Sequence, residues 1–305
     1  MNSGETTADD LDVGARKIGR SRVCIVDPAK RYLDGVASLP PAPTLVTELL
    51  TLFREPDRDV DQVVQLIRYE PALTAQILRM CNSAYFASEQ PPGDIFEAVS
   101  RLGFYQVYCL VVSIFGARTK AMEGADKGVN VEELWRHSVA VAVSASVVEE
   151  EAGQAKAAAF TAGLLHDIGK LVLASVEREP YAGLIQKAKD QGVLLGTLER
   201  CALGTDHAAL GGELMSRWNL PPDVVAAVRH HHHLEASPPY EQLTAAVQVG
   251  NMIAHQLFTE ELANISPLKS STAALDVLLL SPDDVPHLLA KTQAEMEKVK
   301  GMLEI

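Results

Sequence analysis

The sequence predicts an all-α protein. Apolar residues recur at intervals of three and four along nearly the whole chain, and this spacing lines one face of an α-helix. No segment of useful length shows the alternation of apolar and polar residues that indicates a β-strand, and no internal repeat is present. The chain has 305 residues, of which 47% are hydrophobic, so it is long and apolar enough to bury a large aliphatic core.

Proline and glycine residues mark the boundaries of the predicted N-terminal elements. Residues 1–30 lack helical periodicity and are expected to be mobile, with at most a short extended piece at 22–26. A stiff proline-rich stretch, SLPPAPT at 38–44, leads into the first amphipathic helix. Predicted helices cover residues 45–53, 60–67, 71–81, 95–102 and 107–117.

A polar, glycine-containing stretch at 118–130 is the best candidate for an internal boundary. We therefore expect an N-terminal helical part at 31–125, a second helical unit at 126–260 and a C-terminal helical extension at 261–305. The later predicted helices cover 132–150, 157–175, 180–191, 195–203, 207–218, 222–232, 242–257 and 282–302. The last has a strong start signal, because Ser281 can serve as N-cap before a proline and two aspartates.

Charge and cysteine usage indicate the compartment and the class of partner. A formal net charge of −13 disfavours binding to DNA, RNA or anionic lipid, although a local basic pocket for a phosphorylated small molecule remains open. The four cysteines (Cys24, Cys81, Cys109 and Cys201) are scattered in apolar settings, which predicts free, buried thiols in a reducing cytoplasm. The polar, acidic N-terminus is unlike a signal peptide, and the apolar runs are too short to span a bilayer.

Histidines are concentrated in the second helical unit. None of the nine lies in the first 136 residues, and seven lie between His137 and His233. They occur in four contexts: LWRHSVA at His137, LLHDIGK at His166 and Asp167, GTDHAALG at His207, and AVRHHHHLE at His230 to His233. On one helix, His166 and Asp167 would point about 100° apart and could reach a common point, with Lys170 on the face of His166.

Each of these residues also has a plain structural interpretation. His137 alone could be a hydrogen-bonded core histidine, His207 could brace a helix start beside Asp206, and Lys170 could send its ammonium group to solvent. At most two imidazoles of the HHHH run can face one interior point, so the other two are expected to be solvated.

Taken together, the four contexts predict a shared polar or metal site inside a helical bundle. Neutral imidazole suits Fe, Mn, Zn or Ni, and a carboxylate can bridge two ions while lowering the charge of the site. The predicted cofactor is therefore one or two divalent transition-metal ions.

Several motifs resemble a known family. LLHDIGK, LWRHS and DHAALGGELMSRWNLP before VVAAVRHHH resemble the HD superfamily of metal-dependent phosphohydrolases. Four further stretches resemble the HDOD branch of this superfamily, the HD-related output domain: SLPPAP, YEPALTAQILRMCNSAYF, EAVSRLGFYQV and ERCALGTDHAALG. The resemblance covers roughly residues 39–257, and it implies an all-helical fold in which an N-terminal helical subdomain packs on an HD-like bundle.

The resemblance also implies a ligand set. In related HD enzymes that carry a GYP signature, the matching positions would make His137, His166 and Asp167 ligands of one metal. Asp167 would bridge to a second metal held by His207 and by His231 or His232. Lys170 would contact a substrate phosphate. Two departures stand out, because the GYP signature is absent and Asn251 occupies the position of a late aspartate ligand.

Two functions follow as hypotheses. The first is a bacterial signal-transduction output or adaptor module that contacts a partner protein and holds metal in its HD-like site. The alternative is a metal-dependent phosphohydrolase acting on a nucleotide or cyclic dinucleotide, with Lys170 and Asp167 in catalytic roles. Oxygen-dependent chemistry at a di-iron site is a third, minor possibility.

Overall fold

All regular elements of the described structure are helical, which confirms the predicted fold class. The computed structural model describes residues 28–35, 44–55, 59–67, 73–74, 77–78, 81, 92, 94–119, 129–154, 156–258 and 268–303. Its helices are α1 (Pro28–Gly35), α2 (Thr44–Phe53), α3 (Val60–Ile67), α5 (Ile95–Leu102), α6 (Phe104–Thr119), α7 (Val131–Glu151), α8 (Lys156–Leu165), α9 (Ile168–Gln191), α10 (Leu195–Leu203), α11 (His207–Arg217), α12 (Pro222–His230), α13 (Glu241–Phe258), α14 (Leu268–Val277) and α15 (Val285–Leu303).

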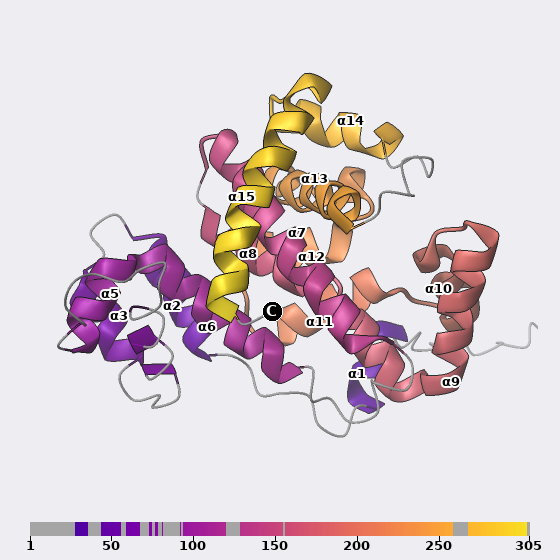
Figure 1. Cartoon of the computed structure of the whole chain (residues 1–305). Coiled ribbons are helices and arrows are strands. Elements are labelled where there is room, and N and C mark those ends of the chain that lie inside the picture. The colour runs from indigo at the N-terminus through magenta and orange to yellow at the C-terminus, as the bar shows by residue number, and fades with distance from the viewer. Residues whose placement is uncertain are drawn as a thin grey trace, which may run out of the picture.

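The helices form a central bundle with an extension on each side (Figure 1). Helices α7, α8, α11, α12 and α13 pack against one another in the bundle. Helices α2, α3, α5 and α6 gather at one side, and α9 and α10 form an arm at the other. Helix α1 packs on α9 and α11, far from the elements that follow it in sequence. The bundle therefore lies between the N-terminal helices and the arm.

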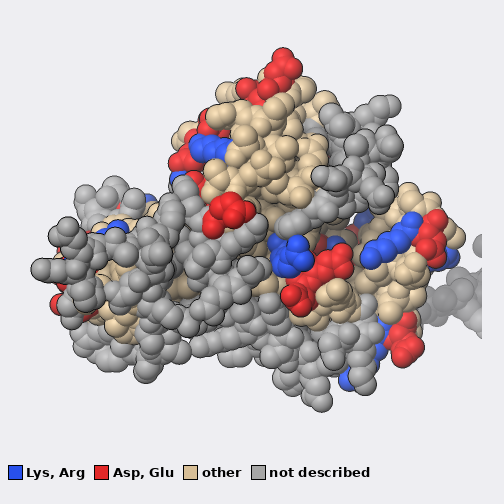
Figure 2. Space-filling model, viewed as in Figure 1, with Lys and Arg blue, Asp and Glu red and all other residues tan. Residues whose placement is uncertain are grey.

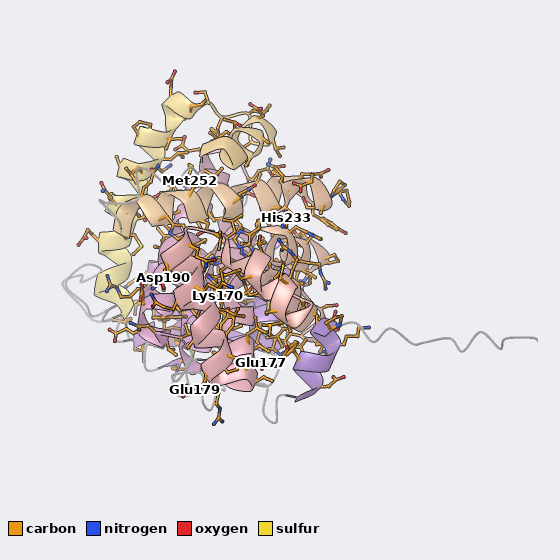
Figure 3. All side chains as sticks on the ribbon, turned by 90° about the vertical axis from the view of Figure 1, so that its right-hand side faces the viewer. Lys170, Glu177, Glu179, Asp190, His233 and Met252 are labelled. Atoms are coloured by element: carbon orange, nitrogen blue, oxygen red, sulfur yellow. The ribbon has the colours of Figure 1, made fainter. Side chains whose placement is uncertain are left out.

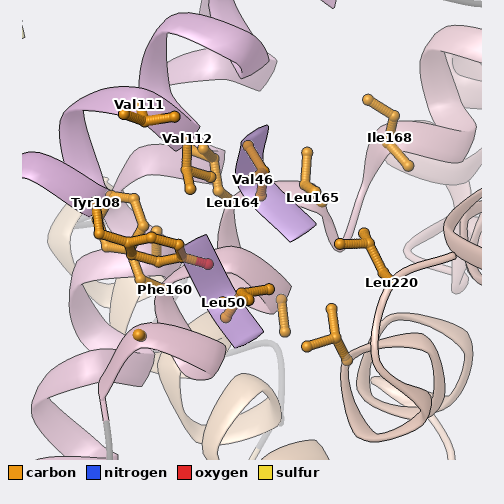
Figure 4. Packing of buried hydrophobic residues seen from close by; sticks show 14 of the residues in the cluster. Val46, Leu50, Tyr108, Val111, Val112, Phe160, Leu164, Leu165, Ile168 and Leu220 are labelled. Carbon is orange, nitrogen blue, oxygen red and sulfur yellow. The ribbon is translucent and has the colours of Figure 1, made fainter. Parts of the chain in front are cut away.

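The N-terminal helices and the bundle share one hydrophobic core (Figure 4). Val46 and Leu50 of α2 and Tyr108 of α6 are buried in the same cluster as Phe160 and Leu164 of α8. Helix α8 therefore packs into this core and leads directly into the His166–Asp167 pair. The segment predicted as an internal boundary lies mostly outside the described residues, so the division into domains stays a prediction.

The predicted single helix over 157–175 is wrong in one informative respect. Helix α8 ends at Leu165 and α9 begins at Ile168, so His166 and Asp167 form the turn between two helices. The predicted interruption before Pro180 is present as a kink at Arg178 inside α9. Proline has no backbone N–H and cannot donate the helical hydrogen bond, which explains why the helix bends there.

The C-terminal region differs from prediction at its start. Ser281 forms the expected capping box with Asp284, but residues 282–284 make a turn of 3-10 helix and α15 begins at Val285. Helix α14 was not predicted. Its Leu275, and Leu278 directly after it, join a second buried cluster with Ile253 of α13.

Some sequence predictions fall outside the described residues or need correction. Most of residues 1–30, the stretch 38–44 and much of the predicted helix over 71–81 are not described, although α1 already begins at Pro28. Cys81 is buried, but Cys201 is exposed on α10, so the expectation that every cysteine is buried was wrong.

The stretch Lys156–Gln191 is long and apolar enough on average to cross a membrane. In its most apolar window, however, 89% of the residues are buried inside the protein. Core helices of water-soluble proteins show the same combination.

Candidate metal centre

Two histidines present buried, unpartnered nitrogens. The Nδ1 atom of His166 lies 2.7 Å from the carbonyl oxygen of Gly163, and that of His231 lies 2.8 Å from the carbonyl oxygen of Val228. A carbonyl can only accept, so each Nδ1 carries a proton, and in the neutral ring each Nε2 keeps its lone pair. Both Nε2 atoms are buried and have no hydrogen-bond partner. They are therefore arranged as metal ligands are, with the outward nitrogen fixed by a backbone bond.

Asp167 lies at the middle of the histidines. Its Oδ2 is 3.3 Å from Nε2 of His166, while its Oδ1 is 3.4 Å from Nε2 of His207 and 3.9 Å from Nε2 of His231. The carboxylate is almost fully buried, and Oδ1 has no hydrogen-bond partner. One carboxylate therefore faces imidazoles from two directions, as a ligand that bridges two ions must.

The six predicted ligands form two groups that meet at Asp167. His137, His166 and Asp167 offer ligand atoms that lie within 4.8 Å of one another, and so do His207, His231 and His232. The Nε2 atoms of His207 and His232 are 3.0 Å apart. Within the HHHH run, buried His231 and the more exposed His232 belong to this second group, whereas His230 and His233 belong to neither, so two imidazoles face the centre and two do not.

Lys170 does not extend freely into solvent. Its Nζ lies 2.6 Å from Oδ2 of Asp167, and its side chain is 23% exposed. Figure 3 shows Lys170 near the middle of the molecule, away from Glu177 and Glu179 further along α9. Burial alone would raise the pKa of the Asp167 carboxyl, but the neighbouring His166 and Lys170 hold that pKa well below its usual range. Asp167 is therefore an ionised carboxylate with a cation at its edge.

The buried carboxylate of Glu199, which the sequence did not point to, orients His207. Oε2 of Glu199 lies 2.6 Å from Nδ1 of His207 and also accepts its backbone N–H at 2.9 Å. Tyr181 donates its hydroxyl to the other oxygen of Glu199 at 2.6 Å. Burial opposes the ionisation of Glu199, but its bonds to His207 outweigh burial and lower its pKa. The arrangement directs the Nε2 of His207 toward Asp167.

Replacing Glu199 with glutamine should weaken metal binding without emptying the centre. Glutamine keeps the shape but loses the charge that makes the imidazole a better donor, so we expect the dissociation constant of the bound metal to rise by about 10- to 100-fold. Competition with a fluorescent chelator measures this change. Glu179→Gln, on the exposed part of α9, is the matched control and should bind metal as the unmodified protein does.

Helix α13 contributes two further polar side chains, those of Asn251 and His255. The Oδ1 atom of Asn251 is buried and has no hydrogen-bond partner. One turn further along α13, the ring of His255 lies 4.7 Å from that of His137. Residues four apart share a helix face, so Asn251 lies on the side of α13 that faces His137. The resemblance to HD enzymes placed Asn251 where those enzymes carry a late aspartate ligand, and nothing was assigned to His255.

Three histidines of the centre, His137, His231 and His232, have lowered pKa values and are neutral near pH 7. Burial lowers the pKa of His137 to about 3, and it lowers the pKa of His231 well below its ordinary value, with His232 adding to the effect. Neutral imidazole is the form that binds metal, so His137, His231 and His232 need lose no proton before an ion enters. The donor set of imidazoles, one carboxylate and an amide oxygen fits a divalent transition metal.

These shifts predict that the metal-free protein is destabilised by acid. Below about pH 6.5 the unfolded chain protonates His231 while the folded chain does not, so stability falls as pH falls and is unaffected above that value. For one fully buried histidine the loss between pH 6.5 and pH 5 is about 2 kcal/mol. Thermal unfolding with chelator present should show a steeper pH dependence for the unmodified protein than for His231→Gln. His233→Gln, at an exposed position, should show no such change.

A family model identifies the chain. The HDOD domain model matches residues 39–234, which is more than half of the sequence. The chain belongs to the HDOD family. Its fold matches that of an HDOD domain protein from Geobacter sulfurreducens with a TM-score of 0.74, 23% identity and coverage of 90% of this chain and 95% of the other.

Other HDOD-like structures carry functional names. A candidate phosphohydrolase from Shewanella amazonensis SB2B is 26% identical with a TM-score of 0.63, and the match covers 89% of this HDOD chain and 95% of the other. A candidate signal transduction protein from Marinobacter aquaeolei VT8 is 21% identical with a TM-score of 0.72, and the match covers 90% of this chain and 65% of the other.

Sequence relatives include longer proteins. An uncharacterized protein of Treponema pallidum is 28% identical over 73% of this HDOD chain and 44% of its own length. Ribonuclease Y of Lawsonia intracellularis is 25% identical over 64% of this chain and 31% of its own length. The HDOD chain thus spans less than half the length of these curated relatives.

Proposed function

We propose that this HDOD protein is an output or adaptor module of bacterial signal transduction whose HD-like centre holds one or two divalent transition-metal ions. The observation that carries the proposal is the convergence of buried ligand atoms without hydrogen bonds: Nε2 of His166, Oδ1 of Asp167 and Nε2 of His231. Each such atom costs free energy unless it finds a partner. A bound ion would partner several of them at once.

A structural role for the metal is supported by charge and by position. Asp167 is the only anion among the candidate ligands, and the amide of Asn251 contributes no charge. The six candidate ligands come from α7, α11, the turn between α8 and α9 and the end of α12, so ions bound to the two groups would link these helices of the bundle. Because α8 also packs on α2 and α6, that link would reach the N-terminal helices.

A protein is the expected partner of the module. Among the described residues on the face shown in Figure 2, acidic and basic side chains are interspersed and form no broad basic surface suited to a phosphate backbone. Together with the net charge of −13, this supports a protein partner in the cytoplasm over nucleic acid or a membrane.

The test combines metal content, stability and turnover. Untagged protein purified without added metal should contain one or two equivalents of Fe, Mn, Zn or Ni, and chelation should lower its melting temperature. His166→Ala/Asp167→Ala should lose the metal, whereas His233→Ala should keep it. Metal-loaded protein should hydrolyse no phosphodiester. Robust metal-dependent turnover of any nucleotide would contradict the adaptor role.

A phosphohydrolase is the second candidate. It is supported by the arrangement of Asp167 between two histidine groups with the Lys170 ammonium beside it, and by the names of the Shewanella and ribonuclease Y relatives. A metal bound there would supply a water of lowered pKa as the nucleophile. The ammonium of Lys170 would neutralise a substrate phosphate, and Asp167 would position the ions.

Lys170→Gln separates the two functions. If the protein is a hydrolase, this substitution should abolish turnover and leave metal content unchanged, because Lys170 is not a ligand. The panel should include cyclic dinucleotides, mononucleotides and short RNA. Complete inactivity of the metal-loaded protein across the panel would eliminate the hydrolase.

A further inference from the structure

A second cavity lies between the N-terminal helices and the bundle, apart from the histidine centre. It has a volume of about 860 Å³ and contains none of the candidate metal ligands. Residues of α2 and α6 form one side, and residues at the end of α7 and the starts of α8, α12 and α13 form the other. Its aromatic lining includes Phe53, Phe104 and Tyr105. Cavities of this size and lining commonly hold small molecules.

Glu149 brings an unpartnered carboxyl group to this cavity. The residue is only 3% exposed, yet within the described part of the chain no group forms a hydrogen bond or ion pair with its side chain. Burial raises the pKa of Glu149 to about 7, and the nearby carboxylate of Asp223 raises it further. A buried carboxyl group without a hydrogen-bond partner costs folding free energy. Such groups are more often found where a bound ligand supplies the missing partner.

The other charged groups of the lining are already neutralised. Arg54 holds both oxygens of Asp223, at 2.7 and 2.9 Å, and so ties α2 to α12 across the cavity. Lys156 forms an ion pair with Glu150, and its ammonium lies 5.3 Å from the centre of the Tyr105 ring. When its carboxyl group is ionised, Glu149 therefore leaves the lining one positive charge short of balance.

We propose that this cavity binds a small organic cation. An amidinium, guanidinium or ammonium head would donate to the Glu149 carboxylate, and an apolar body would lie among Phe53, Phe104 and Tyr105. Aromatic faces also attract cations, as the position of Lys156 over Tyr105 illustrates. A neutral ligand would leave the buried charge unbalanced, and an anion would be repelled. The proposal does not depend on the function of the histidine centre.

Benzamidine and benzamide test this as matched probes, since they share a ring and differ in the charge of the head group. Calorimetric titration of the full-length, chelator-treated protein should show binding of benzamidine that is about 10- to 100-fold tighter than binding of benzamide, the range expected for a hydrogen bond to a charged group. Glu149→Gln should abolish the preference. Glu151→Gln, an acidic position outside the lining, should retain it. Equal binding of the two probes, no binding of benzamidine, or a preference that survives in Glu149→Gln would overturn the proposal.

A second variant protects the test against a folding defect in Glu149→Gln. Ala158 lines the cavity and is half-buried, so Ala158→Leu adds volume at the wall without changing charge. Benzamidine binding to Ala158→Leu should weaken by about tenfold or more, with an unchanged circular dichroism spectrum. Unchanged affinity would place the probe elsewhere and contradict the assignment.

Discussion

Asp167→Asn will empty the metal centre. Asparagine has nearly the same shape as aspartate, but it removes the only negative charge among the candidate ligands and leaves one coordinating oxygen where there were two. Replacing a partner outside the first ligand shell already weakens metal binding by 10- to 100-fold, so loss of the shared carboxylate should raise the dissociation constant by more than about 100-fold. The expected readout is a fall from one or two metal equivalents per chain to nearly none.

The variant also separates ligand loss from misfolding. Lys170 loses its partner in Asp167→Asn, but its side chain is 23% exposed and can turn to solvent, so the metal-free variant should melt close to the metal-free unmodified protein. His233→Gln controls for loss of an exposed residue near the centre and should keep its metal. Full metal content in Asp167→Asn would mean that the ions, if any, are held elsewhere.

Gly169→Ala will be among the most destabilising single substitutions in the chain. A Cβ atom on Gly169 would lie 2.0 Å from the carbonyl oxygen of His207 and 3.0 Å from the backbone nitrogen of Gly211. Both contacts are with backbone, so no side chain can move aside and α9 must separate from α11. We expect a loss of about 3–5 kcal/mol in the free energy of unfolding. His207 would move with its backbone, so metal content should fall as well.

Gly183→Ala on the same helix is the matched control. A Cβ atom there would have no neighbour within 4 Å, and the position is exposed. Alanine should therefore stabilise α9 by about 0.5–1 kcal/mol through its higher helix propensity. Chemical denaturation of both variants measures the difference. If Gly169→Ala unfolds at the same denaturant concentration as the unmodified protein, the close approach of α9 to α11 is not required.

Much of the candidate site could be predicted because its residue types are rare and grouped. Imidazoles concentrated between His137 and His233 pointed to one centre, and the structure brings all six predicted ligands together. The HHHH run was also interpreted correctly in one respect, since two of its imidazoles face the centre. Their roles as ligands stay predictions until metal content is measured.

The residues that support the ligands could not be found in the same way. Glu199 and Tyr181 are common residue types, and only packing shows that they form a buried chain to His207. Glu149 is one of 40 acidic residues, and nothing in its neighbourhood of sequence distinguishes it from Glu150 and Glu151. Hydrogen bonds and buried contacts between segments that are far apart in the sequence leave no local pattern of residue types.

By itself, the sequence determined the all-α class, most helix positions and the set of metal-ligand candidates, because helical periodicity and residue type are local properties. Only the tertiary structure decided that His166 and Asp167 form a turn between α8 and α9. It also decided that Gly169 lets α9 approach the backbone of His207, and that Glu149 lines a cavity whose cations Arg54 and Lys156 are paired with other carboxylates. The physical reason is that one apolar stretch is compatible both with a single long helix and with two helices joined by a turn. The choice between them depends on which buried polar groups find partners across the fold.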